Sequence, residues 1–131
     1  MKAFHFINFI AIALILVFIC LSEELVVSTS LNDIQNRCLT IERVVEEKGT
    51  LQDMEVVVAL DNLEFRWSED ESKLCYMVNH KNVQEIGQEI VKARQYVTEN
   101  NMEEFKVSIE LIKLYCHSYL HFMGANIHNV L

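Results

Sequence analysis

The sequence predicts an all-α fold in which an N-terminal transmembrane helix precedes an antiparallel bundle of three or four helices. The evidence is a nearly uninterrupted apolar run at the start, apolar residues at steps of three and four afterwards, and very few turn formers. The chain has no proline and only three glycines. The tight turns of all-β sandwiches and barrels need such residues, so helices joined by short connections are expected.

The apolar run extends from Ala3 to Leu21 and contains only two polar side chains, His5 and Asn8. As a helix it would rise roughly 28 Å, close to the thickness of the hydrocarbon core of a bilayer. We therefore expect residues 1–22 to form an anchor that contacts the membrane through residues 3–22. Residues 23–131 are long enough for one domain.

The end of the run leaves a second possibility open. Cys20 and Ser22 are small enough to serve as a signal-peptide cleavage site, which would release a secreted helical factor. In either case Lys2 precedes the run and two glutamates follow it. Positive charge stays on the cytoplasmic side, so we expect a single pass with a cytoplasmic N-terminus and an extracytoplasmic C-terminal domain.

The charge balance restricts the partners of the domain. The chain has 11 Lys and Arg against 19 Asp and Glu, a net charge of −8. So acidic a surface repels the phosphate backbone of nucleic acids, which we do not expect as partners, and it also repels anionic lipid headgroups.

Helical periodicity divides the domain into four segments. The first carries the stripe Leu31, Ile34, Cys38, Ile41 and Val45, and ends at Gly49. It could begin afresh at Ser30 or continue from the membrane. The second is expected to begin at Thr50 as N-cap, with the stripe Val56, Leu60, Leu63, Trp67, Leu74 and Met77.

On the second segment, the run Glu69, Asp70 and Glu71 is interpreted as a solvated outer face. The third segment carries Val83, Ile86, Ile90, Ala93 and Val97, and the fourth Phe105, Ile109, Ile112, Cys116, Tyr119 and Met123. Gly87 lies inside the third segment, where it suggests close approach of a neighbouring helix. We expect Asn101 to cap the fourth helix and Gly124 to end it.

Three cysteines, Cys38, Cys75 and Cys116, fall on three of these segments. Their spacing matches no zinc motif, so they are expected to act as small buried hydrophobes, with a disulfide across the core as the alternative.

Few residues suggest chemistry. His117 and His121, four residues apart on one helix, could bind zinc or copper together with Cys116, His128 or His80, but the segment holds no acidic residue and lacks the HExxH pattern. Solvent-facing histidines are therefore the simpler interpretation. His80 could be a pH-sensitive hinge or a helix cap, and Trp67 a docking anchor or a core residue.

Motifs of enzymes are missing from the sequence: there is no G-x-S-x-G and no phosphate-binding glycine loop. We expect no catalytic residues and no cofactor. The chain is therefore not expected to be an enzyme.

Several features together resemble a known family. They are the anchor, the tryptophan-containing second helix, the histidine at a junction, the helix NVQEIGQEIVKARQYV and the closing residues NVL. This order is similar to the small, mainly Firmicute, bacterial family called domain of unknown function 4363. The resemblance implies a membrane-attached helical protein and no particular activity.

The function expected from the sequence is a noncatalytic, membrane-anchored module that binds or supports another membrane or envelope protein. The alternatives are the secreted factor and a metal-binding or pH-sensing module built on His117 and His121.

Overall fold

The computed structural model describes residues 2–128, and the side-chain surroundings of residues 5–121. The described chain consists of helices joined by short turns and contains no β-strand. The helices are α1 (Lys2–Lys48), α2 (Met54–Met77), α3 (His80–Glu99) and α4 (Met102–His128). The prediction of an all-α fold is confirmed.

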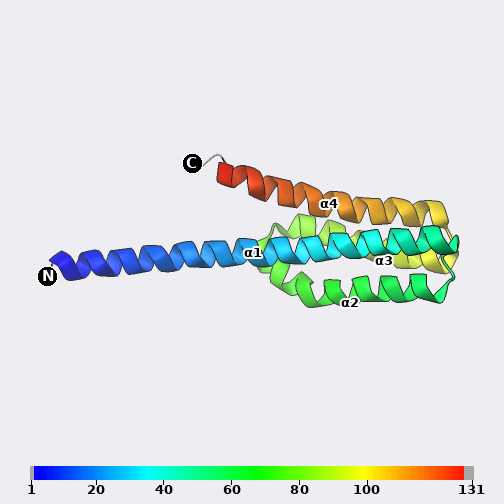
Figure 1. Cartoon of the computed structure of the whole chain (residues 1–131), viewed down its shortest axis with the longest axis horizontal. Coiled ribbons are helices and arrows are strands. Elements are labelled where there is room, and N and C mark those ends of the chain that lie inside the picture. Colours follow the sequence, from blue (N-terminus) through cyan, green and yellow to red (C-terminus); the bar gives the residue numbers. More distant parts are fainter. Residues whose placement is uncertain (1, 129–131) are drawn as a thin grey trace.

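The helices form an up-down-up-down bundle in which each packs against two neighbours (Figure 1). The pairs in contact are α1 with α2, α2 with α3, α3 with α4, and α4 with α1. Packing is most extensive between α3 and α4 and least extensive between α2 and α3. The bundle is therefore least tightly closed along its α2–α3 side.

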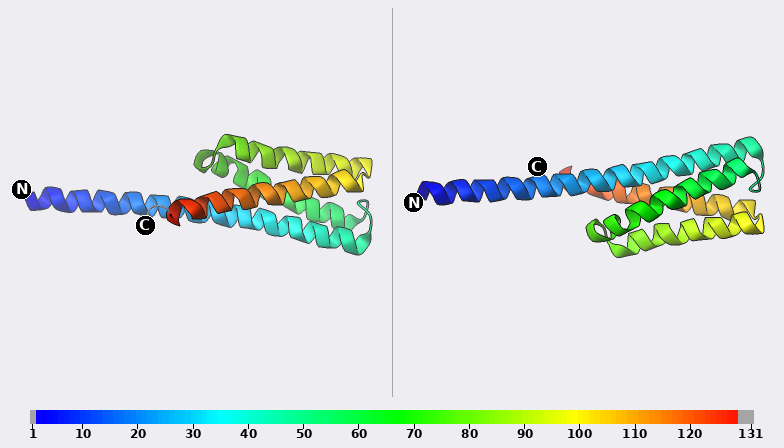
Figure 2. Two further views of the ribbon diagram at one scale, coloured as in Figure 1. Left: turned by 90° about the horizontal axis from the view of Figure 1, so that it is seen from above. Right: turned by 90° about the horizontal axis from the view of Figure 1, so that it is seen from below.

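Helix α1 runs without a break from the apolar segment into the bundle, so the helix does not begin afresh at Ser30. Its 47 residues correspond to a length of about 70 Å. The N-terminal half projects alone beyond the other helices in every view (Figures 1 and 2). Residues 5–21 are exposed throughout, and the first buried residue of α1 is Val27.

The core is built from the predicted stripes, as helical periodicity requires when one face of each helix turns inward. Met77 is an exception: it was expected on the buried stripe of α2 but is 38% exposed, at the last residue of that helix. Its largest fully buried apolar side chains are Phe105, Ile34, Ile41, Leu51, Leu60, Leu63, Leu74, Ile109 and Ile112. The stripe of α1 from Leu31 to Val45 is buried at every predicted position.

The first connection differs from the prediction at its cap. Gly49 has the left-handed φ of 65° expected for a helix end. Thr50 is not the N-cap of α2, however: the cap is Asp53, whose Oδ1 accepts a hydrogen bond of 2.9 Å from the amide of Glu55. Burial of Leu51 holds the intervening turn against the core and moves the start of the helix to Met54.

The other two connections are equally short. Asn79 caps α3 by accepting a hydrogen bond from the amide of Lys81 at 3.0 Å. Asn100 follows α3 in the left-handed conformation, with φ of 54°, and Asn101 accepts a hydrogen bond from the amide of Glu104 at the start of α4.

Helix α4 does not end at Gly124, contrary to the prediction, but continues to His128. A glycine inside a helix costs only about 1 kcal/mol relative to alanine. No proline follows Gly124, so that cost is too small to stop the helix there.

The acidic run on α2 also differs from the prediction at one position. Asp70 is only 1% exposed, whereas Glu69 and Glu71 face solvent. Its Oδ2 lies 3.1 Å from Nε of Arg66, and the same Nε lies 2.9 Å from a carboxylate oxygen of Asp33 on α1. Asp70 thus belongs to an ion-pair cluster that joins α1 to α2.

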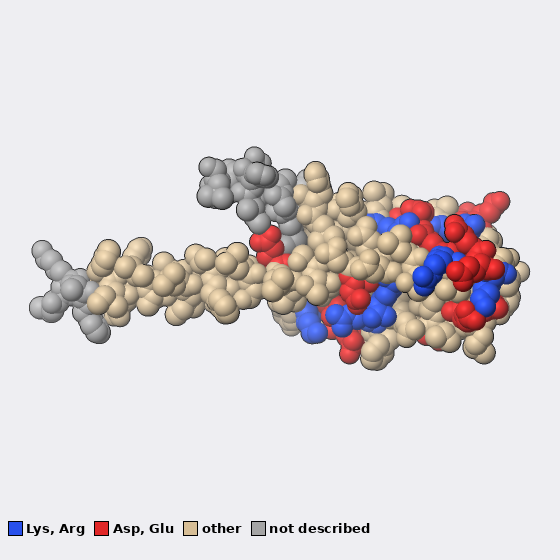
Figure 3. Space-filling view, viewed as in Figure 1, with Lys and Arg blue, Asp and Glu red and all other residues tan. Residues whose placement is uncertain are grey.

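Charged side chains of both signs cover the bundle, mostly at the end remote from the N-terminus of α1 (Figure 3). The projecting half of α1 shows no charged side chain on the face drawn. The charge pattern therefore separates the chain into an apolar projection and a polar bundle.

Candidate functional site

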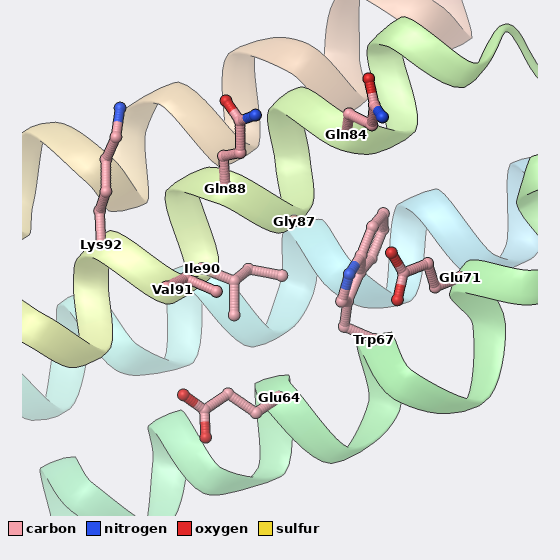
Figure 4. A pocket seen from close by; sticks show the side chains of 9 residues that line it. All are labelled: Glu64, Trp67, Glu71, Gln84, Gly87, Gln88, Ile90, Val91 and Lys92. Atoms are coloured by element: carbon pink, nitrogen blue, oxygen red, sulfur yellow. The ribbon is translucent and has the colours of Figure 1, made fainter.

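A groove of about 620 Å³ lies between α2 and α3. Figure 4 shows the side chains that line it: Glu64, Trp67 and Glu71 from α2, and Gln84, Gly87, Gln88, Ile90, Val91 and Lys92 from α3. The groove follows the side of the bundle where packing between neighbouring helices is least extensive.

The wall of the groove depends on Trp67 and Gly87. A methyl group at Gly87 would lie 3.2 Å from Nε1 of the Trp67 indole, closer than almost all real contacts of this kind. The absence of a side chain at Gly87 therefore lets the indole lie against α3. The sequence predicted that a neighbouring helix comes close to Gly87. In the structure the group that comes close is the indole of Trp67 on α2.

Trp67 has one side in the core and one at the groove. It is only 6% exposed and belongs to the buried cluster, yet it lines the groove. The two interpretations of Trp67 from sequence, core residue and docking surface, are compatible in this position. A tryptophan at the wall of a groove offers a large apolar ring that is already ordered by the core, so contact with it costs little conformational entropy.

One residue that lines the groove, Glu64, belongs to an ion pair between α2 and α3. Arg94 on α3 donates hydrogen bonds to both carboxylate oxygens of Glu64 on α2, at 2.8 and 2.7 Å, and also contacts Asp61. The hydrogen bonds with Glu64 raise the pKa of Arg94 above its ordinary value, so the guanidinium remains charged. This pair links α2 to α3 across a boundary where apolar contacts are sparse.

The rest of the groove is open and partly apolar. Val91 lies beside Ile90 but off the buried stripe of α3, and it is 68% exposed although its side chain is apolar. At the other end the Glu71 carboxylate lies beside the indole of Trp67 (Figure 4). Glu71 forms no ion pair with any described residue, whereas Lys92 is paired with Glu89 at 2.7 Å.

The histidines singled out in the sequence lie elsewhere. His117 and His121 are exposed on α4 with their rings stacked, the centroids 6.5 Å apart. His80 is exposed at the start of α3, where Asn79 and not the histidine provides the cap. None of these residues lines the groove, and His128, also considered as a ligand, has a side chain outside the described part.

Metal ligands do not gather in the described part of the chain: no group of three or more His, Cys, Asp or Glu side chains could hold an ion there. Stacked rings four residues apart provide at most a pair of ligands, and a third would be needed for a structural or catalytic zinc site.

The cysteines of the described residues are unpaired, and no disulfide crosses the core. Cys38 on α1 and Cys116 on α4 are fully buried, and Cys75 is partly exposed. Burial raises the pKa of Cys116 to about 12 and raises that of Cys38 as well. These two thiols are thus held protonated as small hydrophobes, which makes them poor nucleophiles and poor metal ligands.

The sequence alone does not reveal the groove, apart from Trp67 and the close approach at Gly87. Gln84, Gln88 and Val91 lie on the face of α3 opposite its core contacts, and only exposed Val91 gives a signal, because it is apolar but off the stripe. The arrangement offers an apolar floor, one unpaired carboxylate and a tryptophan. Such a surface can bind a side chain or a helix, but the residues that line it form no nucleophile–base pair.

Comparison with known proteins gives one result. No curated protein and no solved structure matches the chain. The family model described as Domain of unknown function (DUF4363) matches residues 26–130. That match covers the buried part of α1 and the three other helices, and the chain therefore belongs to the DUF4363 family of domains of unknown function.

Proposed function

We propose that this protein is a noncatalytic, membrane-anchored helical module that binds another membrane or envelope protein through the α2–α3 groove. The observation that carries the proposal is the exposed apolar half of α1, which continues without a break into the bundle. The helix is long and apolar enough to cross a membrane.

The apolar half of α1 needs a nonaqueous environment. Most of its large side chains are at least half exposed, among them Phe6, Phe9, Leu14 and Phe18. Monomeric soluble proteins rarely expose a contiguous apolar surface of this extent. A bilayer would cover the whole segment, and the helical backbone satisfies its own hydrogen bonds there.

The groove supports a partner of particular chemistry. Trp67 and Val91 offer apolar contact, while Glu71 offers an unpaired negative charge at the edge, and the whole chain carries a net charge of −8. The fitting partner is a helix that presents an apolar side chain to the groove and a lysine or arginine to Glu71.

Because the protein is anchored in the membrane, a small groove is sufficient to bind a partner in the same membrane. A module held at the membrane meets other membrane proteins at a high effective concentration, so a contact of low intrinsic affinity is still occupied. Because α1 is one continuous helix, the bundle is also held at a fixed height above the lipid.

Site-specific photo-crosslinking in cells tests this proposal. A photoreactive residue replaces Val91 in the groove or, as matched control, Val107, an exposed valine of α4 that does not line it. We expect a discrete adduct from position 91 alone, mapping to a partner segment that contains a basic residue. Glu71→Gln is expected to reduce the adduct several-fold.

The same adducts from both positions, or an adduct at position 91 that is unchanged by Glu71→Gln, would contradict binding at the groove. Absence of any adduct at position 91 under several growth conditions would contradict it as well.

A further inference from the structure

The C-terminal end of α4 reaches the level of the membrane anchor. Tyr119 of α4 and Leu31 of α1 line the same small cavity, so they lie at a similar height in the bundle. Both helices rise about 1.5 Å per residue, and they run in opposite directions. The nine residues from Tyr119 to His128 therefore bring the end of α4 close to the level of Ser22, nine residues before Leu31.

The pictures agree with this estimate. Helix α4 extends beyond the α2–α3 junction toward the N-terminus of α1 in all three ribbon views (Figures 1 and 2). Val78 at that junction lines the cavity shared by Tyr119 and Leu31, so the junction stays at their height. The end of α4 is thus the part of the bundle nearest to the apolar segment.

Charged residues are absent from the part of α4 that approaches the level of Ser22. Lys113 is the last charged residue, and positions 114–131 contain no Asp, Glu, Lys or Arg, although charged residues make up 23% of the chain. Tyr115 and Tyr119 belong to this uncharged segment, and each is only partly buried against the core.

We propose that the last turns of α4, which end at His128, form a second membrane contact in the headgroup region of the same bilayer leaflet through which α1 emerges. The inference rests on the membrane-anchored function proposed above. It places two points of the bundle, the emerging α1 and the end of α4, on one lipid surface.

Lipid is the occupant that the observations favour. Any surface at the level of Ser22 on a chain anchored through residues 5–21 faces the headgroup layer unless another protein intervenes. The segment carries no Asp, Glu, Lys or Arg, so the contact is apolar in origin and needs no anionic lipid.

The proposed contact of α4 with lipid must be compared with the expectation that the acidic domain is repelled by anionic headgroups. The acidic surface as a whole repels anionic headgroups. Many charged side chains lie toward the end of the bundle remote from the anchor (Figure 3), but Glu23 and Glu24 directly follow the anchor, so part of this repulsion acts at the lipid surface. The C-terminal part of α4 adds no Asp or Glu to it.

Depth-dependent fluorescence quenching of the full chain in vesicles provides the test. His128→Trp places a tryptophan at the last residue of α4, and Val107→Trp places the matched control on the same helix at the remote end. The signal of the native Trp67 is measured in the wild type and subtracted. The vesicles contain phosphatidylcholine with brominated acyl chains, or with added phosphatidylglycerol.

We expect brominated lipid to reduce the emission from position 128 by at least about twofold in both lipid mixtures, and to leave position 107 unquenched. Flotation with the vesicles and resistance to alkaline extraction report separately whether α1 is inserted. Circular dichroism confirms that each variant keeps its helical content.

If α1 is inserted but position 128 is unquenched, the second contact is refuted and the anchor stands. Quenching at both positions would mean that the whole bundle lies on the membrane, which also refutes the inference. Failure of the wild-type chain to float with the vesicles would refute the anchor, and the second contact with it.

The tryptophan introduced at position 128 could itself favour the interface, so a second measurement uses the opposite change. In the double variant Asn126→Glu, His128→Glu, charge is placed on the last turns of α4. Hydrogen exchange of Tyr119–His128 in vesicles is expected to become several-fold faster than in the wild type, while exchange at Phe105–Ile112 stays the same. Unchanged exchange in both segments would contradict the inference.

Discussion

Gly87 and Trp67 show how single residues set the shape of the groove. The glycine reduces the helix propensity of α3, and the indole occupies the space that a side chain at position 87 would need. Glycine at position 87 thus lowers the stability of α3 locally but leaves room for the indole that forms the wall of the groove.

We predict that Gly87→Leu destabilises the fold by about 1 to 3 kcal/mol, because the larger side chain must displace the indole. Trp67 is the only tryptophan, so its fluorescence reports on this site alone, and its emission is expected to shift to longer wavelength. Urea unfolding gives the free energy. Gln84→Leu is the control: it adds a leucine to the exposed side of the same helix, and a similar loss there would contradict the contact.

The buried Asp70 is a second residue-scale feature with a measurable consequence. Asp70→Asn removes the charge that faces Arg66 and is expected to destabilise the fold by about 2 to 3 kcal/mol. The expected loss is smaller than for a fully buried ion pair, because the side chain of Arg66 is 30% exposed and still pairs with the carboxylate of Asp33 in the variant. Chemical unfolding measures the loss.

The matched control for this change is Glu69→Gln on the same turn of α2. Its carboxylate is 46% exposed and 3.5 Å from the same arginine, so the expected loss is below about 0.5 kcal/mol. Equal effects of the two substitutions would show that burial of Asp70 does not matter.

The buried thiols give the fold a defined dependence on pH. The thiol of Cys116 has its pKa raised by burial from 9.0 to about 12. The unfolded chain releases this proton near pH 9 and the folded chain retains it, so stability is complete below that value and falls as the pH rises from about 9 toward 12. Cys38 acts in the same direction.

This dependence can be measured as the urea midpoint at several pH values between about 7.5 and 10.5. The wild type is expected to lose stability across this range, and Cys116→Ala to lose less. Lys92, whose pKa is raised by its hydrogen bond to Glu89, contributes in the same direction, so the slope decreases without vanishing. An equal slope in both proteins would contradict the assignment to the thiol.

At the scale of helices and turns, the connections remote from the anchor use two residues in the left-handed conformation, Gly49 after α1 and Asn100 after α3. Only glycine adopts this conformation without a steric cost, and asparagine tolerates it better than most residues. The two positions therefore respond in opposite ways to substitution.

Gly49→Ala is expected to cost about 1 kcal/mol of unfolding free energy from backbone strain alone, since a methyl group there meets no atom within 4 Å. Asn100→Gly is expected to be neutral or slightly stabilising, because the left-handed backbone is kept and its strain removed. Thermal unfolding of both variants checks the pair. A loss of stability in Asn100→Gly larger than in Gly49→Ala would contradict the account.

The helices were the part most readily predicted from sequence. Steps of three and four identify which residues turn inward, because a helix has a fixed period, and the stripe from Leu31 to Val45 is buried as predicted. The ends were less certain. Thr50 and Asp53 are both good caps, and only the burial of Leu51, a tertiary effect, places the helix start after the second of them.

The groove could be predicted only in part. Trp67 was recognised as a possible docking residue, and Gly87 as a point of close approach. Their mutual contact, the ion pair between Arg94 and Glu64 and the burial of Asp70 are pairings between helices. Periodicity describes one helix at a time and holds no information about such pairings.

At the scale of the whole molecule, the chain consists of one long helix that both leaves the bundle and forms a quarter of it. This continuity couples the position of the apolar segment to that of the groove. In the proposed arrangement, lipid covers residues 5–21, the end of α4 touches the same surface, and the charged end of the bundle points away (Figure 3).

The measurement that tests this arrangement most directly is the intact mass of the protein isolated from cell membranes after alkaline extraction. An uncleaved anchor predicts a chain of 15.3 kDa that starts at Met1 and stays with the membranes. A shorter chain that begins near Glu23 and is found only in the soluble or secreted fraction would contradict it.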